Sequence, residues 1–172
     1  QDVADLIGAD PREIVWTSGA TEANNAWVAH LARKTRGPVL ISGLEHPSVR
    51  IPAAQWLTDR CKNLPVSREG VVSPDQVGER LRRGDVGAVV LMAANNETGT
   101  VSDLEGIARL LATAAHRPLW LVDGVQALGK MDLQLPARGV DYAVFSGHKL
   151  HAPKGIGLLY VRRGAPFTPL VV

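Results

Sequence analysis

Lys149 is the residue whose type and setting offer the most distinctive chemistry. It ends the run Ser-Gly-His-Lys at residues 146–149, between two apolar segments and ahead of a turn rich in Gly and Pro. A lysine partly withdrawn from water loses its proton more readily and can form a Schiff base with a carbonyl compound. Lys154 is the competing candidate, but its place before Gly155 favours a turn or surface role.

Asp123 directly follows a run of apolar residues, 119–122. A buried carboxylate is costly without a partner. A helix N-terminus or a backbone cap is one possible partner, and the protonated ring nitrogen of a ligand is the other. Gln126, three residues on, could donate to the same ligand or cap a helix.

The segment Ser18-Gly19-Ala20-Thr21 stands between an apolar run and a helical stretch. Small residues let a ligand approach the backbone, and free amides with the Thr21 hydroxyl suit a phosphate. An ordinary strand-to-helix turn with a Ser or Thr cap is the alternative. There is no Walker lysine and no GxGxxG, so a nucleotide site is poorly supported.

His46 follows Glu45 after another apolar run. It could stack on a flat ring, carry protons, or be a satisfied core histidine. The histidines form no pair at metal-ligand spacing on a helix face, so no metal site is predicted. The single cysteine, Cys61, excludes an internal disulfide and a multi-cysteine zinc site, and a bystander thiol is favoured over a nucleophile.

Composition indicates one folded domain of about the usual size. Nineteen Lys and Arg against seventeen Asp and Glu give a net charge of +2, and the basic residues are scattered. This balance does not predict a nucleic-acid or membrane-surface protein. No apolar run approaches the length of a membrane span.

Changes in hydrophobic period place the elements that would position these residues. Strands are expected at residues 13–17, 38–42, 64–66, 86–93, 119–122, 142–145 and 156–161. Helices are expected from about 22 to 34, over 48–60, after a Ser73 cap, and from a Ser102 capping box to 116. The alternation predicts an α/β fold with a mostly parallel central sheet flanked by helices, which binds ligands beyond the carboxyl ends of its strands.

Together these features describe a pyridoxal-phosphate site: a phosphate cup, a ring-facing histidine, an acid for the ring nitrogen and a lysine. The sequence resembles the class V aminotransferase family, and within it the cysteine desulfurases of the nitrogen-fixation type. The matching runs, in family order, are residues 17–25, 45–47, 94–100, 123–130 and 146–155. Gly124 departs from the family pattern, which commonly has alanine there.

The resemblance implies roles for individual residues. Lys149 would hold the cofactor aldehyde and move protons on the substrate carbon, and His46 would stack on the ring and assist. Asp123 would keep the ring nitrogen protonated. Gln126 would hydrogen-bond the phenolic oxygen, with Asn96 near that oxygen and the substrate carboxylate. The phosphate would be held by Ala20, Thr21, Ser146 and His148.

The resemblance also implies what lies outside the matching runs. Residues 1–172 would be the cofactor-binding large domain of a type I pyridoxal-phosphate fold, truncated at both ends and lacking the C-terminal small domain. The family's sulfur-accepting cysteine and its carboxylate-binding arginine lie in that small domain, and Cys61 does not match the catalytic position. The isolated chain is therefore expected to be inactive.

The expected activity is removal of sulfur from L-cysteine, giving L-alanine and an enzyme persulfide. The expected setting is a cytoplasmic homodimer that serves a sulfur-acceptor protein such as an iron–sulfur scaffold. A selenocysteine lyase or another class V enzyme is the alternative, since residues 49–52 and 167–170 are similar to selenocysteine lyases. A non-catalytic module that binds a protein or a phosphorylated ligand is the alternative from another class.

Overall fold

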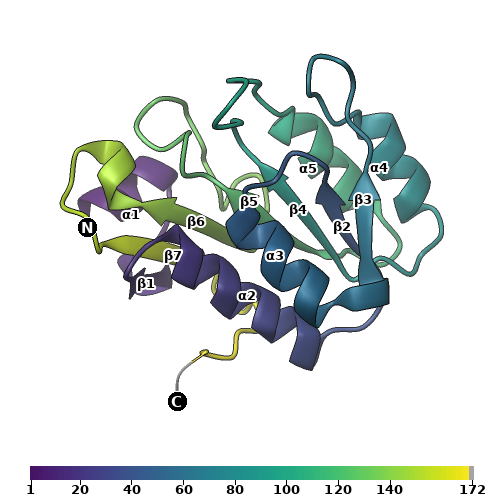
Figure 1. Cartoon of the computed structure of the whole chain (residues 1–172), viewed down its shortest axis with the longest axis horizontal. Coiled ribbons are helices and arrows are strands. Elements are labelled where there is room, and N and C mark those ends of the chain that lie inside the picture. Colours follow the sequence, from purple (N-terminus) through teal and green to yellow (C-terminus); the bar gives the residue numbers. More distant parts are fainter. Residues whose placement is uncertain (171–172) are drawn as a thin grey trace.

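The computed structural model describes residues 1–170, which form three layers with a seven-stranded sheet in the middle (Figure 1). The strands are β1 (Ile14–Thr17), β2 (Val39–Ser42), β3 (Cys61–Leu64), β4 (Ala88–Met92), β5 (Leu119–Asp123), β6 (Tyr142–Ser146) and β7 (Gly157–Val161). The α-helices are α1 (Asp2–Ile7), α2 (Ala20–Lys34), α3 (Pro47–Trp56), α4 (Pro74–Leu81) and α5 (Leu104–Thr113). Short 3₁₀ turns are η1 (Pro11–Glu13), η2 (Thr58–Arg60) and η3 (Gly147–Leu150).

The sheet order is β1-β7-β6-β5-β4-β2-β3. Neighbours from β6 to β3 pair in parallel, while β7 pairs antiparallel with both β6 and β1. All strands except β7 therefore point the same way, and their carboxyl ends share one edge. This confirms the predicted α/β class with a mostly parallel sheet.

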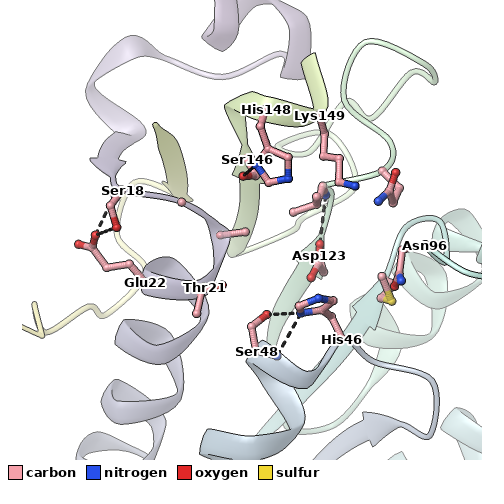
Figure 2. A pocket seen from close by; sticks show the side chains of 15 residues that line it. Ser18, Thr21, Glu22, His46, Ser48, Asn96, Asp123, Ser146, His148 and Lys149 are labelled. Atoms are coloured by element: carbon pink, nitrogen blue, oxygen red, sulfur yellow. Dashed lines mark hydrogen bonds between the residues drawn. The ribbon is translucent and has the colours of Figure 1, made fainter. Parts of the chain in front are cut away.

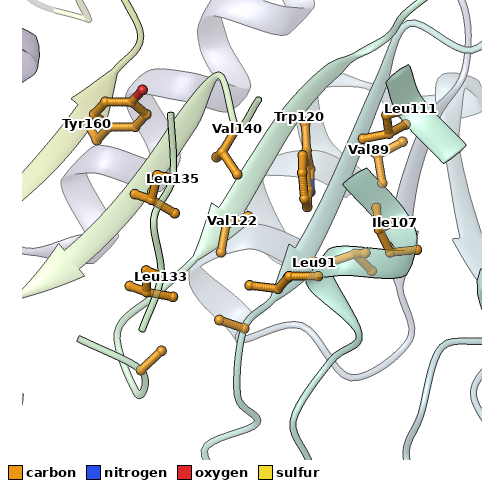
Figure 3. Close-up of a cluster of buried hydrophobic side chains, with 14 of the residues drawn as sticks. Val89, Leu91, Ile107, Leu111, Trp120, Val122, Leu133, Leu135, Val140 and Tyr160 are labelled. Atoms are coloured by element: carbon orange, nitrogen blue, oxygen red, sulfur yellow. The ribbon is translucent and has the colours of Figure 1, made fainter. Parts of the chain in front are cut away.

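Alternate residues of the central strands supply two separate cores. On one face, Ala88 and Val90 pack with residues of α2 and α3, including Trp27. On the other face, Val89 and Leu91 pack with Ile107 and other residues of α4 and α5 (Figure 3). Burial on both faces explains why β4, β5 and β6 read as continuous apolar runs.

The strand expected at 64–66 is wrong: β3 spans Cys61–Leu64. It pairs with β2 as an edge strand, and of its four residues only Leu64 is buried. Because Lys62 and Asn63 are exposed, the strand carries no apolar run that the sequence pattern could reveal. The helix expected over 48–60 also ends early, at Trp56, and the 3₁₀ turn η2 follows.

Of the two predicted serine caps, Ser73 does occupy the N-cap position of α4, whereas Ser102 as the cap of α5 is wrong. Ser73 precedes α4 but its side chain makes no capping hydrogen bond. The N-cap of α5 is Asp103, whose Oδ1 accepts from the Gly106 N–H at 2.7 Å. The Ser102 hydroxyl instead donates to the Met92 carbonyl at 2.6 Å, which anchors the chain to the end of β4.

No helix within residues 1–170 is long and apolar enough to cross a membrane. The same residues contain no group of three or more His, Cys, Asp or Glu side chains placed to hold a metal ion.

Candidate cofactor site

A pocket of about 290 Å³ opens at the shared carboxyl edge of the strands (Figure 2). This volume is at the lower end of the range for small-molecule pockets, about 300 Å³ upward. It is lined by Ser18, Gly19, Ala20, Thr21, Glu22, His46, Ser48, Met92, Asn96, Asp123, Val125, Gln126, Ser146, His148 and Lys149. All nine residues predicted from the sequence are among them, although they come from five separate segments. Their roles stay predictions.

The start of α2 forms one wall of the pocket. Its N-cap, Gly19, has no side chain to satisfy the first backbone N–H groups of the helix. These groups, with the positive end of the helix dipole, suit an anion. Glu22 would oppose an anion there, but its carboxylate accepts from the Ser18 N–H and hydroxyl at 2.8 and 2.6 Å and points away from His148 and Lys149 (Figure 2).

A close backbone contact fixes this wall against the sheet. A Cβ on Gly157, at the start of β7, would lie 2.4 Å from the Gly19 Cα. Only glycine at position 157 lets the chain before α2 lie directly on the strand. A Cβ placed on Gly19 would lie 3.9 Å from the Ser146 Oγ, so space remains on the pocket side of Gly19.

Asp123 is the last residue of β5 and is 2% exposed. Its Oδ1 accepts from the Val125 N–H at 3.1 Å, so the backbone-cap alternative is present. Burial raises the pKa of Asp123, and the Val125 N–H, the Asn24 amide and His46 partly offset that rise. No Lys or Arg among residues 1–170 forms an ion pair with this carboxylate. A cationic partner from a ligand would therefore relieve a real electrostatic cost.

His46 is the N-cap of α3 and is exposed to the pocket rather than buried in the core. Its Nδ1 accepts from the Ser48 N–H at 3.1 Å and lies 2.8 Å from the Ser48 hydroxyl. The buried Asn24 amide donates to that hydroxyl at 3.0 Å. Because Nδ1 is an acceptor in this chain, the hydrogen-bond network assigns the ring proton to Nε2.

Sequence reasoning missed Asn24 and Ser48 as part of the site. The one available signal was polarity on the buried side of a helix: Asn24 is 0% exposed on α2 and Ser48 is buried on α3. Buried polar side chains are ordinarily hydrogen-bonded, and here their partner leads to a pocket residue.

Ser146 and His148 lie across the pocket from α2 and interact with each other, with Ser146 Oγ 2.8 Å from His148 Nδ1. Lys149 lies on η3 and, like His148, is exposed. The expected withdrawal of Lys149 from water is therefore not seen. The physical reason is its position: η3 lies beyond the last residue of β6, at the rim of the pocket, where the sheet no longer covers the side chain.

Asn96 and Gln126 occupy the loops after β4 and β5. Asn96 is exposed, and its loop is braced by Asn95, whose Nδ2 donates to the Leu44 carbonyl at 3.1 Å. Gln126 is half-buried in the pocket wall. No hydrogen bond of either side chain is present within residues 1–170, so both amides are available to a ligand.

Cys61 does not line this pocket. It starts β3 at the far edge of the sheet, where it borders a separate surface hollow with Arg50 and Ile51. Burial raises the pKa of its thiol, which disfavours the reactive thiolate.

The donor set of the pocket fits pyridoxal phosphate. An uncapped helix N-terminus matches the phosphate, the Asp123 carboxylate, which has no ion-pair partner within residues 1–170, matches a protonated ring nitrogen, and a primary amine lies at the rim. Figure 2 shows Lys149 and Asp123 on the same pocket, as one bound ring requires.

Comparison with known proteins agrees with this chemistry. The family model described as aminotransferase class V matches residues 1–170. A cysteine desulfurase of Nostoc sp. strain PCC 7120 is 40% identical over all of this chain, which spans 43% of that protein's length. A solved NifS-like protein superposes with a TM-score of 0.87 at 37% identity, over 98% of this chain and 47% of its own. A structure described as SspA in complex with cysteine gives 0.90 at 34%, over 98% and 50%.

Proposed function

This chain belongs to the class V aminotransferase family, and from that premise we propose that the complete protein is a pyridoxal-phosphate-dependent cysteine desulfurase. The observation that carries the proposal is one pocket that joins an uncapped helix N-terminus, a buried carboxylate without a cation partner among residues 1–170, and a lysine. The relatives named as cysteine desulfurases support the choice of reaction.

Pyridoxal phosphate supplies an aldehyde that bonds to amines and a ring that withdraws electrons from the substrate α-carbon. Asp123 holds the proton at the ring nitrogen, and its burial keeps that interaction strong. The first turn of α2, with Thr21, Ser146 and His148, binds the phosphate and fixes the ring's position.

His46 and Lys149 both line the pocket and would act on the reacting atoms. The bond from Ser48 orients the imidazole of His46 and leaves Nε2 as the nitrogen that carries the ring proton. The amine of Lys149 would bind the cofactor aldehyde and would move a proton at the substrate α-carbon. The sulfur of cysteine passes to a thiol to give a persulfide, and a proton takes its place on carbon, which yields alanine.

Cys61 is not that thiol in this proposal, since it lies outside the pocket. Residues 1–172 serve as the cofactor-binding large domain, and the sulfur-accepting thiol belongs to another part of the complete protein. The proposal extends to a cytoplasmic homodimer that passes sulfur to an acceptor protein such as an iron–sulfur scaffold. The relatives named cysteine desulfurase IscS support only the sulfur chemistry in this extension.

The test compares Lys149→Ala with Lys154→Ala in the complete protein, using absorbance from the near-ultraviolet to the visible and alanine formation from cysteine. The wild type and Lys154→Ala are expected to show a lysine-bound cofactor band and to form alanine. Lys149→Ala is expected to lose both. A wild type that binds no aldehyde cofactor, or a Lys149→Ala variant that keeps the band, would overturn the proposal. Preferred turnover of selenocysteine would overturn the substrate assignment alone.

A further inference from the structure

Glu45 is a buried carboxyl group beside the pocket that the mechanism above does not use. It lies in the connection between β2 and α3, directly before His46, and is 2% exposed. Its Oε1 accepts two hydrogen bonds, from the Ser42 hydroxyl at 2.9 Å and from the Met92 N–H at 2.8 Å. Its contacts therefore join the ends of two strands to the segment that carries the imidazole.

The bond to Met92 replaces one that the sheet cannot make. The pairing of β2 with β4 ends at Ile41 and Val90, two residues before Met92. On its other side Met92 is in register with Asp123 of β5. Since buried N–H groups need acceptors, Glu45 supplies the one that β2 no longer reaches. Met92 lines the pocket, so this bond fixes the position of the pocket wall at Met92.

The second oxygen indicates the charge state of Glu45. Oε2 is buried and has no hydrogen-bond partner among residues 1–170, and no Lys or Arg there pairs with the group. An ionised carboxylate would leave this oxygen charged and unsolvated. Burial first, and the negative charge of Asp123 second, raise the pKa of Glu45 to about 8. Asp123 on β5 is the titratable group whose charge acts on Glu45, and His46 is its neighbour in the sequence.

We propose that Glu45 is a positioning residue of the pocket, which as a neutral carboxylic acid links the connection bearing His46 to the end of β4. Because Glu45 is neutral, it places no second negative charge beside Asp123. Oε1 is the carbonyl oxygen that accepts both bonds, and Oε2 carries the proton. The inference deepens the proposed function, because it concerns residues that would hold the cofactor ring.

The first experiment reads the proton directly and does not require the cofactor. An infrared difference spectrum between the wild-type protein and Glu45→Gln, both cofactor-free at pH 7 and labelled with isotopic glutamate, is expected to show loss of a protonated carboxyl band. Glu79→Gln, an exposed residue of α4, serves as the control and is expected to lose an ionised carboxylate band. Loss of only an ionised band in Glu45→Gln would overturn the inference.

The second experiment follows the bound cofactor in the complete protein. Glu45→Gln keeps a neutral acceptor for Ser42 and Met92, so the midpoint of the cofactor's absorbance titration with pH is expected to match the wild type. Glu45→Ala removes the acceptor for Ser42 and Met92. The induced circular dichroism of the bound cofactor is therefore expected to fall, and the dissociation constant of the cofactor is expected to rise several-fold. A titration shift in Glu45→Gln, or an unchanged dichroism signal in Glu45→Ala, contradicts the role. Absence of cofactor binding in the wild type would instead contradict the proposed function and leave the infrared result intact.

Discussion

Two buried aspartates at opposite edges of the same sheet have opposite surroundings. Asp141, just before β6 at the amino edge, is 0% exposed and accepts from Arg117 at 2.9 Å, Arg162 at 2.6 Å and the Trp120 N–H at 2.9 Å. Asp123, at the carboxyl edge, is almost as buried but has a single backbone donor. The amino edge satisfies its charge within the protein, while the carboxyl edge leaves a charge for something else to satisfy.

The difference separates a stabilising site from a binding site within one layer of strands. Breaking a buried ion pair strongly destabilises a protein, because the remaining charges lose their partners. An unpaired buried acid already carries that cost in the folded protein. Removal of a carboxylate should therefore have opposite consequences at the two edges.

The largest expected effect is on Asp141. Asp141→Ala leaves two arginines and the Trp120 N–H without their acceptor, so the free energy of unfolding should fall by about 3–5 kcal/mol. Chemical denaturation of the cofactor-free protein measures it. A loss below about 1 kcal/mol would show that the arginines are satisfied by water and would remove the contrast between the edges.

Asp123→Asn should be the reverse case. The cofactor-free protein should keep or gain stability, because a buried charge without an ion-pair partner among residues 1–170 is removed. Affinity for pyridoxal phosphate should fall about tenfold to a hundredfold, the loss expected for a hydrogen bond to a charged group of about 1.5–3 kcal/mol. Denaturation and cofactor titration on one preparation check both parts. Equal destabilisation by Asp123→Asn and Asp141→Asn would refute the comparison.

The carboxyl edge should also show a dependence on pH. The pKa of Glu45 is raised to about 8 in the folded protein, so between about pH 4.5 and 8 the folded state holds a proton that the unfolded state has lost. The unfolding free energy should therefore fall as pH rises through that window, by at most about 1.4 kcal/mol per pH unit.

Glu45→Gln should reduce this slope and leave the contribution of Asp123, whose pKa is raised in the same direction. Asp123→Asn should move the slope to lower pH by removing the neighbouring negative charge. Denaturation of the cofactor-free variants at several pH values provides the measurement. A slope that Glu45→Gln leaves intact would assign the pH dependence to another group.

The smallest expected effect tests whether every carboxylate at the carboxyl edge destabilises the fold, or only one that lacks hydrogen-bond donors. Asp103 lies at that edge too, but it caps α5. Asp103→Ala should lower the unfolding free energy by about 1 kcal/mol, the usual value of an N-cap. Ser73→Ala, at a residue without a capping bond, should change it by much less. Equal losses in the two variants would mean that cap geometry does not explain the difference.

Much of the fold could be predicted because its central strands are covered on both sides. The sequence places β4, β5 and β6 through apolar runs that no surface strand would carry. It could not place β3, whose exposed face is polar and whose partner strand lies about twenty residues earlier. It also predicted Ser102 as the cap of α5 in place of Asp103, because the sequence does not show that the Ser102 hydroxyl is bound to the Met92 carbonyl at the end of β4.

The candidate site divides in the same way. The nine residues could be named because small, polar and basic residues directly follow strands whose ends meet at one edge. Asn24, Ser48 and Glu45 act through side-chain contacts between elements, and such contacts leave no spacing pattern. The exposure of the Lys149 side chain could not be predicted from the sequence either, because it depends on how far η3 projects beyond β6.

By itself, the order of apolar runs and the residues that follow them determined the layer architecture, and it predicted the edge of the sheet where a ligand would bind and the type of ligand. These properties are local, because the hydrophobic period and the ends of the strands can be recognised from residues that are neighbours in the sequence. The tertiary structure alone decided which buried acid is paired and which is left without a cation. Partners for a buried charge come from segments distant in the sequence, and only packing brings Arg117 and Arg162 to Asp141 while bringing no cation of the described part of the chain to Asp123.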